Sequence, residues 1–217
     1  MTPIIVAIVA AIQLLMNIPA IAQSAPKILL IAREPLKPGA EAEYDRIESE
    51  TATLAAKLGC PHPYLALQPL SGAKNEVWWL NGFASQEELN SVGEAYRTNE
   101  AWNAALTKNQ KRKEPLTGKS VEQLADLEPQ TRSQPWAVGQ AQYVLVAMNP
   151  AARLAGSTVF KGRDGTRYEI LTANTLEEAE RVANGMKFVL LEVVPRWSFP
   201  ARDWIDGNRK LWKAASK

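Results

Sequence analysis

The side chain best suited to acid–base chemistry is His62, the only histidine among the 217 residues. Its imidazole has an ordinary pKa close to neutral pH. His62 lies in the segment Cys60-Pro61-His62-Pro63, just before an expected strand. It could act there as a general base at the mouth of a cavity beside a sheet. A histidine held between two prolines in a surface loop would give the same pattern, so both interpretations stay open.

A tryptophan-rich segment, EVWWLNGFA at residues 76–84, carries the second group of candidates. Side chains alternate between the two faces of a strand, so Trp79, Asn81 and Phe83 share one face, and Trp78 and Leu80 share the other. Aromatic side chains with a few polar groups are the usual lining of a small-molecule pocket. The buried core of a sheet interface has the same composition, so this alternative also remains.

Several kinds of site are excluded by composition. One cysteine and one histidine cannot form a disulfide framework or a metal site built from several His or Cys ligands. The chain has no Gly-rich nucleotide fingerprint and no G-x-S-x-G element. A net charge of +2 gives no electrostatic basis for nucleic-acid binding. We therefore expect no cofactor, no metal and no nucleic-acid partner.

The first charged side chain is Lys27, and an apolar stretch covers residues 4–16. The triplet Ala20-Ile21-Ala22 has the small residues that signal peptidase prefers, which predicts cleavage before Gln23. The stretch is shorter than the about 20 apolar residues of a membrane span. We expect an exported protein, periplasmic or secreted, with a signal peptide at residues 1–22. An uncleaved N-terminal anchor is the alternative, because the segment before the apolar stretch contains no Lys or Arg.

Hydrophobic periodicity predicts alternating strands and helices over the rest of the chain. Two helices begin with a capping box, Ser85-x-x-Glu88 and Thr175-x-x-Glu178. Asp164-Gly165 marks the turn of a hairpin. The expected strands cover residues 27–33, 64–70, 76–84, 142–148, 157–161, 167–173 and 187–194. The expected helices cover residues 40–58, from 85, 100–113, 120–127, from 175 and 204–214, with a remnant at 149–156.

A weak internal repeat relates residues 76–92 to residues 166–182 at an offset of 90 residues. The two capping boxes match, and so do Val92 and Val182. Each half of the chain shows a version of the split βαβ arrangement. This predicts a first unit at residues 23–128 with a helical extension, a linker at 129–139, and a second unit at 140–217 with a C-terminal helix.

The segment Leu36-Lys37-Pro38-Gly39, followed by Glu43-Tyr44, resembles the strand-to-helix entry of the dimeric α/β-barrel superfamily. That superfamily includes NIPSNAP-like and antibiotic-biosynthesis-monooxygenase-like domains. Tyr96-Arg97-Thr98-Asn99, with Trp102 and Leu106, is similar to the second-helix extension of such domains. The resemblance covers residues 27–110 well and 140–195 more loosely.

The resemblance implies an α+β fold of two ferredoxin-like units with antiparallel sheets and helices on one face of each sheet. The sheets would pack face to face, within one chain as a pseudo-dimer or between the chains of a homodimer. Haem enzymes of this superfamily carry a proximal histidine in their C-terminal unit. This chain has no histidine after position 62, so the resemblance does not extend to haem binding.

Three hypotheses follow, and they leave open whether the protein is an enzyme. The first is an exported module that binds an apolar or aromatic small molecule in an aromatic cavity between the sheets, with Trp79, Phe83 and Gln68 as ligand-binding residues. The second follows from the resemblance: a cofactor-independent oxygenase-like enzyme with His62 as base and Asn81 or Tyr64 orienting the substrate.

The third hypothesis is an envelope or membrane-surface docking protein. Trp204, Leu211 and Trp212 would lie on one face of the basic C-terminal helix, as in helices that bind membrane surfaces. A terminal helix packed on its own domain has the same pattern.

Overall fold

The computed structural model describes residues 23–131, 136–183 and 187–213. The predicted signal peptide and residues 132–135 of the predicted linker lie outside these described residues. The first half of the chain forms β1 (Ile28–Pro35), α2 (Glu41–Leu58), β2 (Leu65–Pro69), β3 (Glu76–Phe83), α3 (Gln86–Thr98), α4 (Glu100–Lys113) and β4 (Val121–Leu127).

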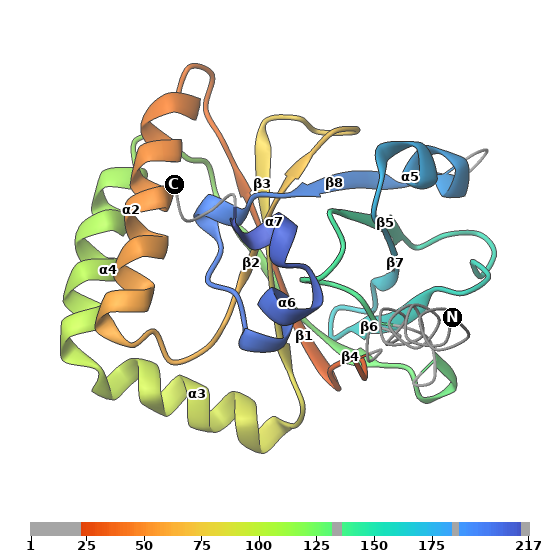
Figure 1. The fold of residues 1–217 in the computed structure, drawn as a ribbon, viewed down its shortest axis with the longest axis horizontal. Coiled ribbons are helices and arrows are strands. Elements are labelled where there is room, and N and C mark those ends of the chain that lie inside the picture. The colour runs from red at the N-terminus through yellow and green to blue at the C-terminus, as the bar shows by residue number, and fades with distance from the viewer. Residues whose placement is uncertain (1–22, 132–135, 184–186, 214–217) are drawn as a thin grey trace, which may run out of the picture.

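The second half of the chain is shorter in helices than the first (Figure 1). Short 3-10 turns at Pro129–Thr131 and Pro195–Trp197 flank it. Its elements are β5 (Tyr143–Met148), β6 (Thr158–Gly162), β7 (Arg167–Ala173), α5 (Leu176–Ala183), β8 (Val189–Val193), α6 (Arg202–Gly207) and α7 (Arg209–Lys213).

The strands close into one antiparallel barrel in the order β1-β3-β2-β8-β5-β7-β6-β4. Within each half, the fourth strand pairs with the first, the first with the third, and the third with the second. This is the split βαβ order of a ferredoxin-like unit, so the predicted fold class is confirmed. The units join through β2 with β8 and β4 with β6. The two sheets therefore face each other within a single chain.

The internal repeat is confirmed in three dimensions, because β3–α3 and β7–α5 occupy equivalent places in the two units. Both capping boxes form. The Ser85 hydroxyl accepts the Glu88 N–H at 3.2 Å, and the Thr175 hydroxyl accepts the Glu178 N–H at 3.1 Å. The Asp164-Gly165 hairpin also forms, with Gly165 at a φ of 91° that suits glycine.

The barrel interior is filled by side chains, as expected for a barrel of this size. Trp78 and Leu80 point inward from β3, where they pack against residues from both units. Other members of this core are Leu29, Ile31, Leu65, Leu67, Val144, Val146, Phe160, Ile170 and Leu191. The space between the two sheets is thus the hydrophobic core of the protein.

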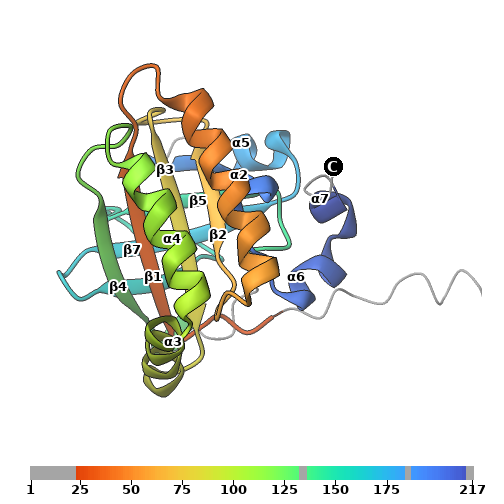
Figure 2. The same cartoon turned by 90° about the vertical axis from the view of Figure 1, so that its left-hand side faces the viewer.

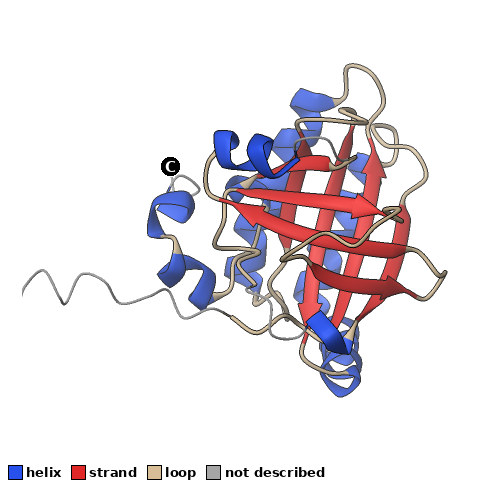
Figure 3. Cartoon of the chain, turned by 90° about the vertical axis from the view of Figure 1, so that its right-hand side faces the viewer, coloured by secondary structure: helices blue, strands red, loops and turns tan. Residues whose placement is uncertain are grey.

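The two sheets are covered differently on their outer faces. Figure 2 shows α2 and α4 side by side across the strands of the first unit. In the second unit, residues 149–157 contain turns in place of the expected remnant of a crossover helix. The buried Glu169 carboxylate holds this loop by accepting the Leu154 N–H at 2.7 Å and the Ser157 hydroxyl at 2.8 Å. Figure 3 shows loops and short helices along this side of the barrel.

The helix predicted at residues 120–127 is wrong, because this segment is strand β4. Its residues have fair helix propensity, but the backbone of β4 pairs with β1 on one side and with β6 on the other. Backbone pairing with two neighbours outweighs a weak local preference. Without β4 the barrel would not close, so this segment completes the first unit.

The single helix predicted at residues 204–214 is two short helices, α6 and α7, separated at Asn208. The Asn208 side chain donates to the Gln140 carbonyl at 2.6 Å and accepts the Leu211 N–H at 3.1 Å. Trp204 and Trp212 stack with ring centroids 6.2 Å apart and pack on the barrel core. The tryptophans proposed to face a membrane therefore contact the chain itself.

Candidate functional site

A cavity of about 280 Å³ lies between the outer face of the first sheet and the helices α2, α3 and α4. Strand β1 contributes Leu30 and Ala32 to its floor, and the helices contribute its walls. Figure 2 shows α2 and α4 side by side across the sheet. Side chains from these helices and from the strands line the cavity between the two layers. In the described part of the second unit, no comparable pair of long helices lies over the sheet.

Strand alternation decides which candidate residues reach this cavity. Trp79 and Asn81 point outward from β3 and line it, together with Tyr64, which precedes β2. The Tyr64 and Trp79 rings meet edge to face with centroids 5.8 Å apart. The Asn81 amide donates to the Pro63 carbonyl at 3.2 Å, which fixes the side chain beside Tyr64. The structure therefore brings these three predicted residues together.

The expected position of this aromatic group, between the sheets, is corrected by the structure. The inward face of β3 carries Trp78 and Leu80, and these side chains belong to the filled core. Trp79 instead faces the helices. The alternation of side chains along β3 predicts which residues share a face of the strand. Only the closed barrel shows that the face with Trp79 borders the cavity.

The remaining predicted site residues lie elsewhere. His62 is buried and stacks on Phe83 with centroids 4.5 Å apart and planes 10° from parallel. Its Nε2 lies 2.9 Å from the Gly82 carbonyl oxygen. Burial lowers the pKa of His62, opposed by the Gly82 carbonyl. Gln68 lies opposite Glu192 in the β2–β8 ladder. None of His62, Phe83 and Gln68 lines the cavity.

Sequence reasoning missed a cluster of buried charged side chains at one end of the cavity. Lys113 Nζ lies 2.5 Å from Glu48 Oε1 and 3.5 Å from Glu34 Oε2. The Tyr44 hydroxyl donates a hydrogen bond to the same Glu34 oxygen. Each of these four residues is at least nine-tenths buried. They come from β1, from the middle of α2 and from the last residue of α4.

Glu48 belongs to the buried stripe of α2. Tyr44, Glu48, Thr51 and Ala55 recur at intervals of three and four residues, and all are buried. That spacing was the available signal, but a glutamate in a buried helical stripe is rare unless it is paired. Its partner Lys113 lies in a basic run at residues 108–113. The composition of this run is typical of a solvent-exposed helix end, so it does not indicate a buried lysine.

The protonation of this cluster is set by burial. Desolvation raises the pKa of Glu48, and the Lys113 ammonium group opposes that rise. Desolvation also raises the pKa of the Tyr44 hydroxyl, helped by the carboxylates of Glu48 and Glu34. Tyr44 therefore stays neutral and serves as a hydrogen-bond donor. One ammonium group faces two buried carboxylates in this cluster.

Apart from Glu48 Oε1, which is ion-paired with Lys113, two polar atoms beside the cavity are buried without a hydrogen-bond partner among the described residues. They are the Tyr64 hydroxyl and Trp102 Nε1. Trp102 is only 2% exposed and enters the cavity from α4. Burial raises the pKa of Tyr64, with smaller contributions from Glu48 and Cys60, so its hydroxyl is also protonated. Most buried polar side-chain atoms are paired, so both atoms call for an explanation.

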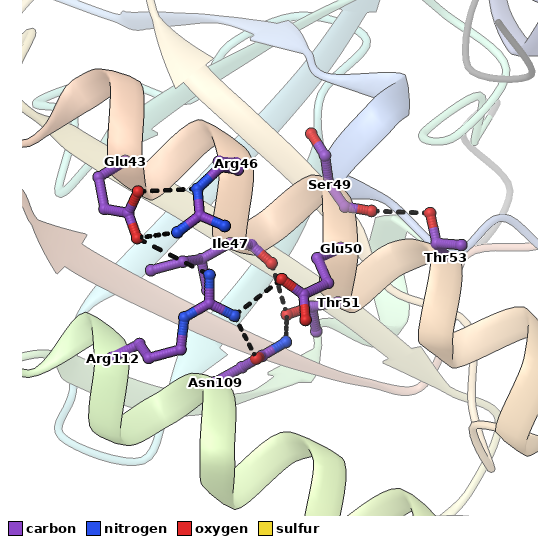
Figure 4. A network of polar contacts seen from close by, with 9 residues as sticks. All are labelled: Glu43, Arg46, Ile47, Ser49, Glu50, Thr51, Thr53, Asn109 and Arg112. Atoms are coloured by element: carbon purple, nitrogen blue, oxygen red, sulfur yellow. Dashed lines mark hydrogen bonds and ion pairs between the residues drawn. The ribbon is translucent and has the colours of Figure 1, made fainter.

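Helix α4 is held over the cavity by a polar network with α2 (Figure 4). The buried Asn109 amide donates to the Thr51 hydroxyl at 2.9 Å. Arg112 donates to Asn109 Oδ1 at 2.9 Å and to Glu50 at 2.7 Å. These directional contacts fix the rotation of α4 about its axis, which keeps Trp102 and Lys113 turned toward the sheet.

Over the described ranges, no three His, Cys, Asp or Glu side chains gather as they would around a metal ion. Within the same ranges, no helix combines the length and apolar character that a membrane span requires. The sole cysteine, Cys60, is buried and reduced, with its sulfur 3.4 Å from the Tyr96 hydroxyl.

No family model matches the chain, and no curated protein matches it. Solved structures give matches at low identity. A "putative monooxygenase" from Fusobacterium nucleatum is 10% identical, with a TM-score of 0.49, over 78% of this chain and 93% of that chain. A protein with the same description from Lactobacillus acidophilus is 10% identical, with a TM-score of 0.46, over the same shares.

A NIPSNAP family protein from Agrobacterium tumefaciens is 17% identical, with a TM-score of 0.37. The match covers 50% of this chain and 93% of that chain. Monooxygenase-like and NIPSNAP proteins are the two groups that the sequence resemblance named.

The raised pKa of Glu48 predicts a specific pH dependence of stability. The folded chain holds the Glu48 proton more tightly than the unfolded chain, whose glutamates titrate near pH 4.3. The free energy of unfolding should therefore lose a contribution as pH rises from about 4.3 through the raised folded pKa. Glu48→Gln lacks this loss, so its stability relative to wild type should increase over that window. Urea unfolding at a series of pH values measures the difference.

Glu41→Gln is the matched control, because Glu41 is exposed in the first turn of the same helix. Its stability relative to wild type should not rise across this pH window. If the free energy of unfolding of Glu48→Gln changes with pH in parallel with that of wild type, Glu48 has the same pKa in the folded and unfolded chains. That result would contradict the burial argument.

Proposed function

We propose that this protein is an exported small-molecule-binding module whose ligand lies in the cavity beneath α2 and α4. The observation that carries the proposal is the pair of unpartnered polar atoms, Trp102 Nε1 and the Tyr64 hydroxyl, at a cavity with aromatic walls. A bound molecule would supply the hydrogen-bond partners that the chain does not.

The energetics favour a ligand. Leaving a buried donor unpaired costs roughly 1–3 kcal/mol, while a hydrogen bond made on binding recovers part of that cost. Trp79, Tyr64, Tyr96 and Trp102 offer apolar surface to the body of a ligand. An aromatic lining with a few convergent polar groups is the common composition of a pocket for organic molecules.

The position of the cavity supports reversible binding. It lies outside the barrel core, so a ligand can enter without opening the β-ladder. Ser120 and the exposed Glu122, next to and at the start of β4, border it on the solvent side. The polar network between α2 and α4 holds the walls in place before any ligand arrives, which reduces the ordering cost of binding.

Export rests on residues 1–22, with their uncharged apolar stretch and the triplet Ala20-Ile21-Ala22. Production in a host with a working export pathway should yield a mature chain that begins at Gln23. Intact mass measurement of the purified protein tests this, since an uncleaved anchor would retain the mass of residues 1–22.

Filling the cavity should abolish binding. Ala32 lies on the cavity floor, so Ala32→Phe would occupy the space that a ligand needs. Small aromatic alcohols and ketones detected with the wild-type protein by ligand-observed NMR should lose their signals with Ala32→Phe. Trp102→Phe keeps an aromatic wall but removes the N–H donor, and should weaken the same compounds by about three- to tenfold.

Ala104→Phe is the matched control, because Ala104 is exposed on α4 and does not line the cavity. It should leave the NMR signals intact. Equal binding by the wild type, Ala32→Phe and Trp102→Phe would place the compounds elsewhere on the protein, and the proposed site would be wrong.

A further inference from the structure

The charges around the cavity are unequal. Three carboxylates line it, from Glu34, Glu48 and Glu122, against one ammonium group from Lys113. Lys113 pairs with Glu48 at 2.5 Å and with Glu34 at 3.5 Å, so one ammonium group serves two buried carboxyl groups. Burying a carboxylate without full compensation is costly. The cavity end of this cluster therefore favours an additional positive charge.

Nearby cations are committed to other partners and do not line the cavity. Arg112 donates to Glu50 at 2.7 Å on the outer side of α2 and α4. Arg33 pairs with Glu76 at 2.9 Å through the inward face of the sheet. Neither arginine borders the cavity. Among the described residues that line the cavity, only Lys113 would present a competing positive charge to a cationic ligand.

The aromatic walls already stabilise one ammonium group. Lys113 Nζ lies 5.5 Å from the centroid of the Tyr44 ring and 5.8 Å from that of the Trp79 ring. Rings at such distances attract cations through their quadrupoles. Trp79 also lines the open part of the cavity, next to Tyr64. The environment thus combines surplus negative charge with aromatic surface, the two features that bind organic ammonium groups.

Trp102 adds a second requirement. Indole N–H is a donor only, so its partner must be an acceptor. An ammonium group has no acceptor and cannot satisfy it. A ligand that meets both ends of the cavity needs a cationic group near Glu48 and Glu34 and an oxygen acceptor for Trp102 Nε1.

We propose that the cavity selects an arylalkylamine with a hydrogen-bond-accepting oxygen, its ammonium group placed beside Glu48 and Glu34. This rests on the proposed function and names its ligand class. Carboxylates of similar shape are disfavoured, because they would add a negative charge beside two buried carboxyl groups.

Three probes with one ring and one methoxy acceptor test the charge preference on the unaltered chain. They are 4-methoxyphenethylamine, 2-(4-methoxyphenyl)ethanol and 4-methoxyphenylacetate, which are cationic, neutral and anionic at pH 7.5. NMR titration should give the amine an affinity at least about tenfold above that of the alcohol, with the carboxylate weaker than both. Because no substitution is involved, the ranking does not depend on the folding of a variant.

The variants assign the preference to named groups. Glu48→Gln should reduce the advantage of the amine over the alcohol to about twofold or less, since the amide cannot carry a negative charge beside the ammonium group. Glu41→Gln, which removes the same charge from the exposed first turn of α2, should leave the advantage unchanged. Trp102→Phe should weaken the amine and the alcohol by equal factors, because both present the same methoxy oxygen.

The outcomes separate this inference from the proposed function. Binding of the alcohol or the carboxylate at least as tight as that of the amine, lost in Ala32→Phe, would overturn the charge preference and leave the binding site standing. Binding of none of the three probes would overturn both. An amine preference that survives Glu48→Gln would contradict the assignment of that preference to the buried cluster.

Discussion

The buried ion cluster of Lys113, Glu48, Glu34 and Tyr44 is the constraint on which the site depends. It joins the last residue of α4 to the middle of α2 and to the outer face of β1. Buried ion pairs add little net stability compared with apolar packing. Removing one partner leaves the other charge buried and uncompensated, which is strongly destabilising. The main effect of the cluster is therefore on the positions of α2 and α4, because both helices must keep these charged groups in contact. With the Asn109–Thr51 hydrogen bond, it fixes the position of α4 relative to α2 and β1, which border the cavity.

The barrel explains why the cavity lies where it does. Two ferredoxin-like sheets close on each other within one chain, and large inward side chains such as Trp78 fill the interior. The cavity beside Trp79 therefore lies on an outer face, under helices long enough to bridge it. The first unit has α2 and α4 for this purpose. In the second unit, a loop held by Glu169 takes the place of the first crossover helix. The two halves therefore share a fold but differ in the elements that cover the outer face of each sheet.

Much of this architecture could be predicted from local signals. The two capping boxes, the Asp164-Gly165 turn and the alternation in β3 each depend on a few neighbouring residues, and each formed as expected. The errors arose where tertiary contacts decide. Strand β4 has the local composition of a helix and is a strand because two neighbours pair with it. Glu48 and Lys113 are far apart in sequence, so neither shows its burial without the other. Strand alternation placed Trp79 and Asn81 on one face of β3, but only the closed barrel reveals that this face borders the helices and that Tyr64 joins it there.

The central claim is that a small molecule binds beneath α2 and α4, with its charge beside Glu48 and its acceptor at Trp102. A crystal structure of the protein soaked with 4-methoxyphenethylamine tests this most directly. The account predicts electron density for the ring against Trp79, the ammonium group next to Glu48 and Glu34, and the methoxy oxygen within hydrogen-bonding distance of Trp102 Nε1. Density for the compound at another site, with this cavity holding only water, would contradict it.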